Sequence, residues 1–209
     1  SFGKSFICID DKNNIELLSK LKIKNYYTYG TSSKAQFQIK SIKQLKEFSQ
    51  YDLSIKLPGK KNILINKIRI PLLGIHNIRN STAAAAVAST IGISKKIIKK
   101  GLREFSGVQR RFSKIFTYRN VSYYDDYAHH PTEIKEVLSG VRAAYKKEEI
   151  ICIFQPHRIS RLKDLKKEFS ASFKKADVVI LCPVYAAGEK MKLGFNYNNF
   201  AKDIIKNSK

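Results

Sequence analysis

The chain has 209 residues, enough for one large domain or two small ones, and 43% hydrophobic residues favour a packed core over disorder. No apolar run reaches the roughly 20 residues of a membrane-spanning helix, and the first residues lack a signal-peptide layout. The 40 Lys and Arg against 17 Asp and Glu give a net charge of +23, spread along the whole chain without an aromatic-basic reader motif. We therefore expect solvated lysine-rich faces and neither membrane nor nucleic acid as partner, with a basic nucleic-acid-binding module as the weaker alternative.

The first part of the chain is dominated by strand-like patterns. Buried or alternating apolar residues predict strands at 5–10, 24–30, 35–42, 52–58 and 62–71. The last three indicate an antiparallel meander, with Pro58 and Gly59 as a turn between two of them. A short helix at 13–21 would have Asn13 or Asn14 as its N-cap.

An Ala-rich helical segment follows the strands. The stretch GIHNIRNSTAAAAVASTIGIS predicts a helix from about Asn77 to Ile91, which Gly92 ends. A second helix is predicted at 94–105, with Ser94 as its N-cap.

After Gly107, which marks a predicted domain boundary, strands and helices alternate. The predicted elements are strands at 113–119, 121–126, 149–155 and 177–183 and helices at 131–145, 160–176 and 196–207. Continuous apolar strands between helices favour an α/β fold with a Rossmann-like, mostly parallel sheet and flanking helices at 108–209. No GxGxxG follows a strand, which argues against dinucleotide binding. Because so small a parallel domain normally carries one more strand, we expect a fragment lacking material at both ends.

Three cysteines lie in apolar runs: Cys8, Cys152 and Cys182. Their number is odd and no CxxC occurs, so we interpret them as buried free thiols. Free thiols are typical of a reducing compartment, which predicts a cytoplasmic protein.

All four histidines lie at predicted strand-to-helix turns: His76, His129, His130 and His157. In open α/β sheets, ligands bind at the carboxyl ends of the strands, where these turns lie. A single histidine would more often be structural, but four at this edge indicate a site.

The motif DDYAHHPTE divides between a helix start and a candidate site. Pro131 suits the first helical turn, Thr132 or His130 could be the cap, and Glu133 complements the helix dipole. A cap does not need Asp126, Tyr127 and His129, which become candidate site residues. For His130 we favour a structural role in the turn.

The motif FQPHRISR repeats this layout after the next strand. Arg158 and Arg161 stand three residues apart, which would place both on one face of the opening helical turn. Two guanidinium groups beside the positive end of a helix are unfavourable unless an anion, such as a carboxylate or phosphate, lies between them. Salt bridges to Asp164 or a neighbouring acid are the alternative.

Weaker signals accompany these two motifs. Arg110 and Arg111 lie in the predicted domain junction, where clefts often form. His76 and Asn80 are four residues apart on one helix face, and an amide suits the edge of a nucleobase. The sequence has no GxxxxGK[ST] phosphate loop, no GxSxG, no HExxH and no zinc-ligand spacing.

A resemblance to the Mur ligase family rests on five motifs in family order: GIHNIRNSTAAAAVA, FSGVQRRF, YYDDYAHHPTEI, FQPHRISRLKDL and DVVILCPVYAAGE. It implies that 1–107 is the C-terminal part of the family's central α/β ATP-binding domain. It also implies that 108–209 is most of the Rossmann-like C-terminal domain. Ala128 departs mildly from the glycine that relatives often have. Without the phosphate loop, this chain alone is not expected to hydrolyse ATP or to ligate.

The resemblance also implies an activity in peptidoglycan precursor synthesis in the cytoplasm. ATP would drive ligation of L-alanine to the carboxylate of UDP-N-acetylmuramate through an acyl phosphate. Mg²⁺ is implied as well, with ligands expected outside this chain, so no metal residue is assigned. The spacing of His157 and Arg161 favours alanine over the peptide used by a sister ligase that shares DD-x-AHHPT. A sister enzyme adding a peptide or another amino acid is the alternative, and the oligomeric state is not indicated.

The implied roles on the nucleotide side fall to four residues. His76 and Asn80 resemble adenine contacts. Arg111 resembles a hinge residue that reaches the nucleotide when domains close, and Asp126 resembles the acceptor for the ribose hydroxyls.

The implied roles on the amino-acid side fall to four others. Tyr127 and His129 would line the alanine pocket, and Arg158 with Arg161 would hold the alanine carboxylate. Such a grip would leave the amine pointing at the acyl phosphate, which is catalysis by positioning. His129, Arg158 and Arg161 are therefore the predicted catalytic group.

Overall fold

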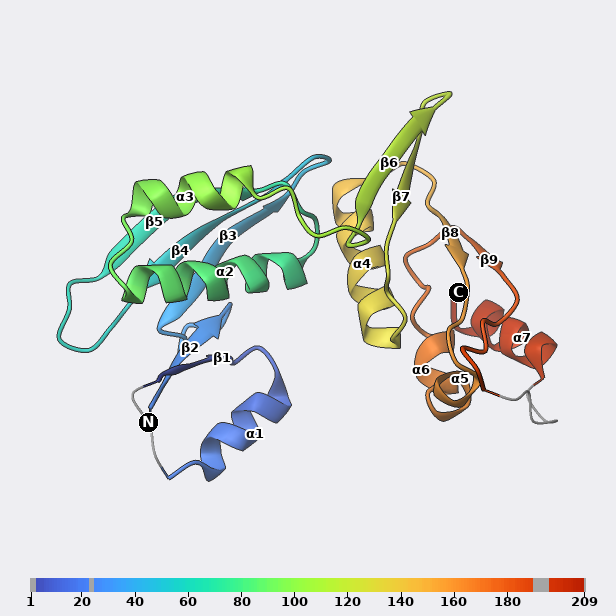
Figure 1. Ribbon diagram of the computed structural model, residues 1–209, viewed down its shortest axis with the longest axis horizontal. Helices are drawn as coiled ribbons and strands as arrows, with labels where there is room; N and C mark the ends of the chain where they lie inside the picture. The colour runs from blue at the N-terminus through green and yellow to red at the C-terminus, as the bar shows by residue number, and fades with distance from the viewer. Residues whose placement is uncertain (1–2, 23–24, 190–195, 209) are drawn as a thin grey trace. The chain divides into compact units, whose positions relative to one another are not determined.

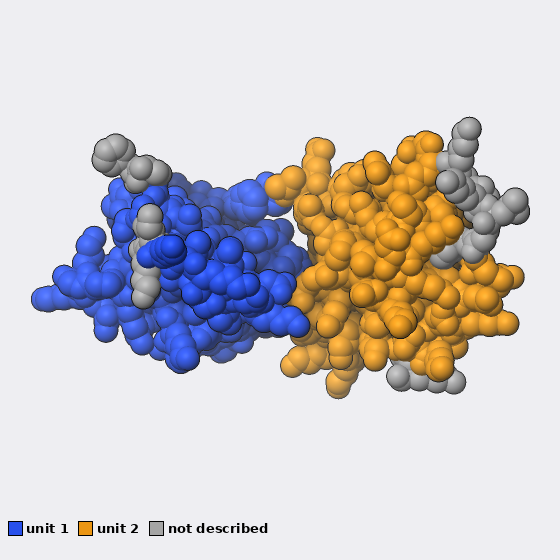
Figure 2. Space-filling view, turned by 90° about the horizontal axis from the view of Figure 1, so that it is seen from below, with its two compact units in different colours: residues 1–107 blue, residues 108–209 orange. Residues whose placement is uncertain are grey.

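The structure, a computed structural model, describes residues 3–22, 25–189 and 196–208. The chain divides into two compact units, Ser1–Gly107 and Val108–Lys209, which are coloured separately in Figure 2. We refer to them as unit 1 and unit 2. None of the helices within the described residues is both long and apolar enough to cross a bilayer.

Unit 1 is built on a five-stranded sheet in the order β1-β2-β3-β4-β5 (Figure 1). The strands are β1 (Ser5–Cys8), β2 (Tyr26–Gly30), β3 (Phe37–Gln44), β4 (Ser49–Ile55) and β5 (Ile63–Ile70). β1, β2 and β3 pair in parallel, whereas β3, β4 and β5 pair antiparallel, which confirms the predicted meander. Lys24, the predicted first residue of the second strand, lies outside the described residues.

The helices of unit 1 are α1 (Lys12–Lys20), α2 (Ile75–Thr90) and α3 (Lys95–Glu104). Ser94 caps α3, as predicted, by accepting a hydrogen bond from the Ile97 N–H. The predicted caps of α1 are wrong, because the helix begins before both asparagines. Asp11 is the N-cap, and its carboxylate accepts hydrogen bonds from the N–H groups of Asn13 (2.7 Å) and Asn14 (3.4 Å).

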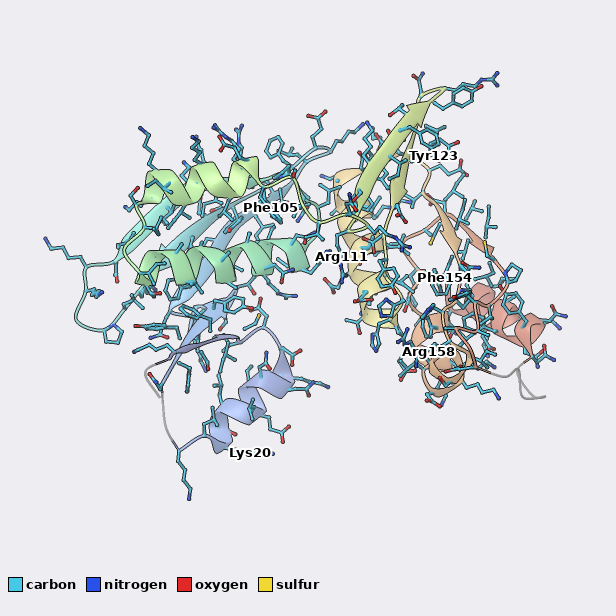
Figure 3. All side chains as sticks on the ribbon, in the orientation of Figure 1. Lys20, Phe105, Arg111, Tyr123, Phe154 and Arg158 are labelled. Carbon is cyan, nitrogen blue, oxygen red and sulfur yellow. The ribbon has the colours of Figure 1, made fainter. Side chains whose placement is uncertain are left out.

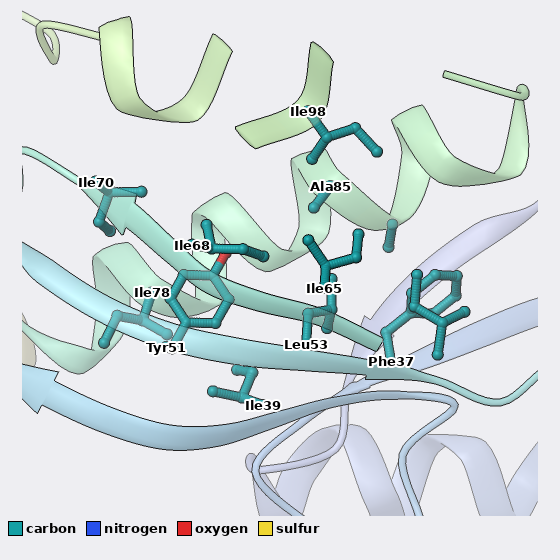
Figure 4. Packing of buried hydrophobic residues seen from close by; sticks show 12 residues of the cluster. Phe37, Ile39, Tyr51, Leu53, Ile65, Ile68, Ile70, Ile78, Ala85 and Ile98 are labelled. Atoms are coloured by element: carbon teal, nitrogen blue, oxygen red, sulfur yellow. The ribbon is translucent and has the colours of Figure 1, made fainter. Parts of the chain in front are cut away.

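The core of unit 1 lies between the antiparallel strands and helices α2 and α3 (Figure 4). A bulge in β5 at Lys67, whose φ is 53° and whose N–H donates to Asp52, lets Ile65 and Ile68 both face the core. Ala85 on α2 is buried, and its small side chain allows the helix to approach the sheet closely.

The described residues of unit 2 form two separate strand pairs. β6 (Ser113–Tyr118) and β7 (Val121–Asp125) form an antiparallel hairpin, whereas β8 (Ile151–Phe154) and β9 (Val178–Leu181) pair in parallel. The helices are α4 (Pro131–Ala144), α5 (Ile159–Asp164), α6 (Lys166–Ser170) and α7 (Tyr197–Ser208). Parallel strands with flanking helices confirm the predicted α/β fold class, and the hairpin adds an antiparallel element.

The single helix predicted at 160–176 is wrong, because α5 and α6 are separated at Leu165, where φ is −114° and ψ is 28°. Leu162 before the break and Phe169 after it are both buried in the core of unit 2. Tertiary packing therefore overrides the local helix propensity of this lysine-rich stretch.

Candidate functional site

The predicted site residues divide between the units. His76 and Asn80 lie on α2 of unit 1, where His76 is half-buried and Asn80 is exposed. The other six, Arg111, Asp126, Tyr127, His129, Arg158 and Arg161, lie in unit 2. α2 starts at Gly74, whose φ of 92° is in the left-handed region that favours glycine.

A buried carboxylate secures α2 to the carboxyl ends of β1 and β2. Asp10, with a side chain 6% exposed, accepts hydrogen bonds from Arg79 Nε (2.9 Å), Thr31 N (2.8 Å) and Thr31 Oγ1 (2.9 Å). Burial alone would raise the pKa of Asp10, but the hydrogen bonds from Arg79 and Thr31 hold it below its usual value. Because Arg79 lies between His76 and Asn80 on α2, this network fixes the helix that carries both candidates.

Gly30 leaves room for that carboxylate. Its φ is 148°, and a Cβ placed on it would lie 2.5 Å from Asp10 Oδ1. Any side chain at this position would therefore collide with the group that joins β1, β2 and α2.

Arg111 lies in a constrained segment that leads into β6 (Figure 3). Its neighbours Arg110 and Phe112 have φ values of 59° and 51°, a backbone conformation that costs free energy in residues other than glycine. The Tyr127 N–H donates to the Arg110 carbonyl (2.8 Å), and the Phe112 N–H donates to Asp126 Oδ2 (2.7 Å). The loop after β7 thus holds Arg111 between two strained residues.

Both carboxylate oxygens of Asp126 accept hydrogen bonds from backbone N–H groups. Oδ2 accepts from Phe112 N, and Oδ1 accepts from Ala128 N at 2.7 Å. These two bonds fix the orientation of the carboxylate just after β7.

Glu133 does more than the predicted complement to the helix dipole. Its Oε2 accepts hydrogen bonds from His129 N (3.0 Å) and His130 N (3.2 Å), and its Oε1 lies 3.7 Å from Arg111 Nη1. Although burial opposes ionisation, the His129 N–H and the charges and donors around it hold the pKa of Glu133 below its usual value. One carboxylate therefore fixes the backbone at His129 and lies beside Arg111.

His130 is the N-cap of α4, in agreement with the structural role favoured from the sequence. Its Nδ1 accepts a hydrogen bond from Thr132 N at 3.3 Å, and Pro131 opens the helix.

The neighbouring His129 makes a different contact, because its Nδ1 lies 2.9 Å from the Tyr127 carbonyl oxygen. A carbonyl can only accept, so Nδ1 carries the proton and Nε2 is the acceptor of the neutral ring.

Arg158 and Arg161 do not share a helical turn as predicted. Arg158 precedes α5 as its N-cap, with φ 68° and ψ 126°, and its N–H donates to the Tyr185 carbonyl at 3.0 Å. Arg161 lies within α5 and directs Nη1 toward the His129 carbonyl at 3.5 Å. Neither arginine forms an ion pair with Asp164 within the described part of the chain.

Four aromatic and imidazole rings join the ends of β7, β8 and β9. Tyr127 and His129 have centroids 5.0 Å apart, His129 and His157 are 6.3 Å apart, and His157 stacks on Tyr185 at 5.3 Å. Partial burial and the nearby Arg161 and His129 lower the pKa of His157. The row, flanked by Arg158 and Arg161, is suited to a small ligand that carries a carboxylate.

The sequence interpretation missed Tyr185 and Glu189, and it gave Glu133 only a role at the helix dipole; it noted His157 at the candidate edge but gave it no role in binding. The motif containing VYAAGE was noted, but nothing local indicated that Tyr185 and Glu189 contact the loop after β8. The contacts join residues almost thirty positions apart, and only the pairing of β8 with β9 brings them together.

Comparisons with known proteins agree on one family. The Mur ligase middle domain matches residues 2–88, and the Mur ligase glutamate ligase domain matches residues 110–207. A UDP-N-acetylmuramate–L-alanine ligase from Pelagibacter ubique is 81% identical over 100% of this chain and 45% of its own length. The corresponding ligase from Bartonella tribocorum is 38% identical over 97% of this chain and 43% of its length. The chain thus spans less than half of the curated relatives that it matches.

Solved structures support the same grouping. A UDP-N-acetylmuramate–alanine ligase from Thermotoga maritima has a TM-score of 0.68 and 26% identity, covering 86% of this chain and 37% of its own. MurF from Acinetobacter baumannii has a TM-score of 0.69 at 20% identity, over 99% of this chain and 41% of its own, which shows a shared fold.

Proposed function

This chain belongs to the Mur ligase family, and from that premise we propose that it is part of an enzyme that ligates L-alanine to UDP-N-acetylmuramate. The reaction uses ATP and passes through an acyl phosphate on the lactyl carboxylate, which the alanine amine attacks. The observation that carries the proposal is the 81% identity, over the whole chain, to a relative named for this reaction. Because the chain covers 45% of that relative, the complete activity belongs to a longer protein.

On the nucleotide side, we assign His76 and Asn80 to adenine and Asp126 to the ribose. Support comes from the rigid seating of α2 by Asp10 and from the position of Asp126 just after β7, where two backbone N–H groups fix its carboxylate. Arg111 would contact the phosphates, since it is exposed and its only ion-pair partner among the described residues is a carboxylate 3.7 Å away. This separation is long for a salt bridge, so a phosphate could replace Glu133 at little cost.

Mg²⁺ is not assigned to any residue of the chain. Within the described residues, no group of three His, Cys, Asp or Glu side chains could hold a metal ion. The sequence also lacks a phosphate loop. No step of the proposal is therefore drawn through a metal bound by this chain.

On the amino-acid side, we assign the alanine carboxylate to Arg158 and Arg161 and the pocket wall to Tyr127 and His129. Paired guanidinium groups would fix the carboxylate, so that the amine is held in one orientation and the entropic cost of attack falls. His129 Nε2, the acceptor of the neutral ring, is suited to take the proton that the amine loses. The arginines would also offset negative charge in the tetrahedral intermediate.

A cytoplasmic location is part of the proposal. Three free cysteines support it, because a reducing compartment keeps thiols unpaired. The proposed partners are the small molecules UDP-N-acetylmuramate, L-alanine and ATP.

The function is tested by phosphate release from ATP by the full-length protein with UDP-N-acetylmuramate and a panel of amino acids and peptides. We expect release with L-alanine to exceed that with L-glutamate by at least about a hundredfold, because the pocket must hold a small side chain beside Tyr127. Release with L-glutamate or a tripeptide but not with L-alanine would assign the chain to a sister ligase. Tight, salt-sensitive binding to nucleic acid without phosphate release would indicate the basic-module alternative.

A further inference from the structure

The loop after β9 is joined to the loop after β8 by a series of hydrogen bonds. The Tyr185 N–H donates to the Pro156 carbonyl (2.9 Å), and the Arg158 N–H donates to the Tyr185 carbonyl (3.0 Å). The Gln155 side-chain amide also donates to the Pro183 carbonyl (3.3 Å). The backbone that carries Arg158 is therefore shaped by the segment that follows β9.

Both loops contain residues in the left-handed region. Arg158 has a φ of 68°, and Ala187 and Gly188 have φ values of 50° and 85° in a turn closed by the Glu189 N–H and the Ala186 carbonyl (3.0 Å). Arginine and alanine gain nothing locally from this conformation, so surrounding contacts must maintain it. Strained residues in two loops that hydrogen-bond to each other are typical of a site whose geometry is imposed by tertiary contacts.

Glu189 supplies the contact that closes this arrangement. Its Oε1 accepts from Ser160 Oγ at 2.6 Å, and its Oε2 accepts from Ser160 N at 3.0 Å. The Ser160 hydroxyl, then the Ser160 and Ile159 N–H groups, lower the pKa of Glu189, so the group is a carboxylate at neutral pH. The first N–H groups of α5 are thus occupied by the protein itself, and a substrate carboxylate depends on guanidinium groups instead.

We propose that Glu189 is a positioning residue that, through Ser160, fixes the start of α5 and thereby orients Arg158 toward the alanine carboxylate. This inference rests on the proposed function. Glu189 would not touch the substrate. It would act by holding Ser160, two residues after Arg158, while the Tyr185 carbonyl holds the Arg158 N–H itself. Its negative charge also offsets the cluster formed by Arg158 and Arg161.

The kinetic test uses the full-length protein and the variants Glu189→Gln, Ser160→Ala and Ser160→Thr. We expect Glu189→Gln to raise KM for L-alanine about tenfold, with KM for ATP and UDP-N-acetylmuramate within about twofold of wild type. Ser160→Ala should raise the alanine KM less, because the N–H bond to Glu189 remains, and Ser160→Thr should restore it. Arg158→Ala, which removes the guanidinium itself, sets the upper limit of the effect. Glu149→Gln, which neutralises an exposed carboxylate of unit 2, is the matched control.

Hydrogen exchange of the same variants gives a readout that does not need activity. Glu189→Gln should speed exchange of the Ile159 and Ser160 amides, and Glu149→Gln should not. Unchanged exchange would show that the contact does not hold α5, and faster exchange with an unchanged alanine KM would show that it does not orient Arg158. An equal rise of all three KM values, or no rescue by Ser160→Thr, would also overturn the positioning role. A wild-type protein inactive with L-alanine would refute the proposed function and, with it, this role, even where exchange confirms the contact.

Discussion

The two units fix their strand ends with carboxylates in different environments. In unit 1, Asp10 is 6% exposed, pairs with Arg79 and joins two strands to a helix. In unit 2, Glu133 is 33% exposed and accepts two backbone N–H groups, and Glu189 accepts the hydroxyl and the N–H of Ser160. A buried ion pair opens only with the structure around it, whereas half-exposed bonds can exchange with water one at a time. The comparison indicates that α2, which carries the proposed adenine contacts, is held more rigidly than the loops of unit 2 that carry the proposed amino-acid contacts.

The largest expected effect comes from breaking the buried pair. Asp10→Ala should destabilise unit 1 by about 2–4 kcal/mol, because it leaves Arg79 and the Thr31 N–H without their shared acceptor. Hydrogen exchange read separately in each unit of the full-length protein measures this, with the exposed Glu47→Ala as control. An equal loss of stability in both units, or no loss in either, would show that the buried Asp10 does not differ from the exposed carboxylates as an anchor.

Lowering the pH should also distinguish the buried carboxylate from the exposed ones, with a smaller effect on stability. Asp10, Glu133 and Glu189 all have depressed pKa values in the folded protein, so their stabilisation is complete above their unfolded values and is lost as the pH falls through the folded ones. Starting near pH 4.5, we expect faster exchange first at the His129 and Ser160 amides and at lower pH at Thr31. Hydrogen exchange, corrected for the intrinsic pH dependence of amide exchange rates, tests this order. If the Thr31 amide lost protection at a higher pH than the His129 and Ser160 amides, the exposed carboxylates would be the firmer anchors.

The smallest expected effect concerns backbone strain beside Glu189. Ala187→Gly should stabilise the turn by less than about 1 kcal/mol, because glycine accepts a φ of 50° without a Cβ penalty but loses more chain entropy. Ala186→Gly is the matched control, since its φ is not positive and it should destabilise instead. Thermal unfolding of the two variants gives the comparison, and identical shifts would show that Ala187 is not strained.

Local signals predicted much of the fold. The Ser94 cap, the helix opened by Pro131 and the meander of β3, β4 and β5 follow from residues adjacent in sequence. The break at Leu165 does not, since it depends on how Leu162 and Phe169 reach the core.

The candidate site shows the same limit. The sequence singled out DDYAHHPTE and FQPHRISR, and the structure brings Tyr127, His129 and Arg161 close together. The sequence did not indicate that Arg158 has a positive φ or that Ser160 contacts Glu189, because those features depend on the pairing of β8 with β9. The motifs predicted which residue types form the candidate site, whereas the orientation of those residues depends on tertiary contacts.

Gly30 carries a consequence for how this sequence can change over time. A methyl group there would lie 2.5 Å from the Asp10 carboxylate, so the two positions are not free to vary independently. At a φ of 148° a side chain at position 30 is strained whatever the space, and a shorter residue at position 10 that made room for it would also remove the partner of Arg79. We expect drift in related sequences to change these three sites as a set or to leave all of them untouched.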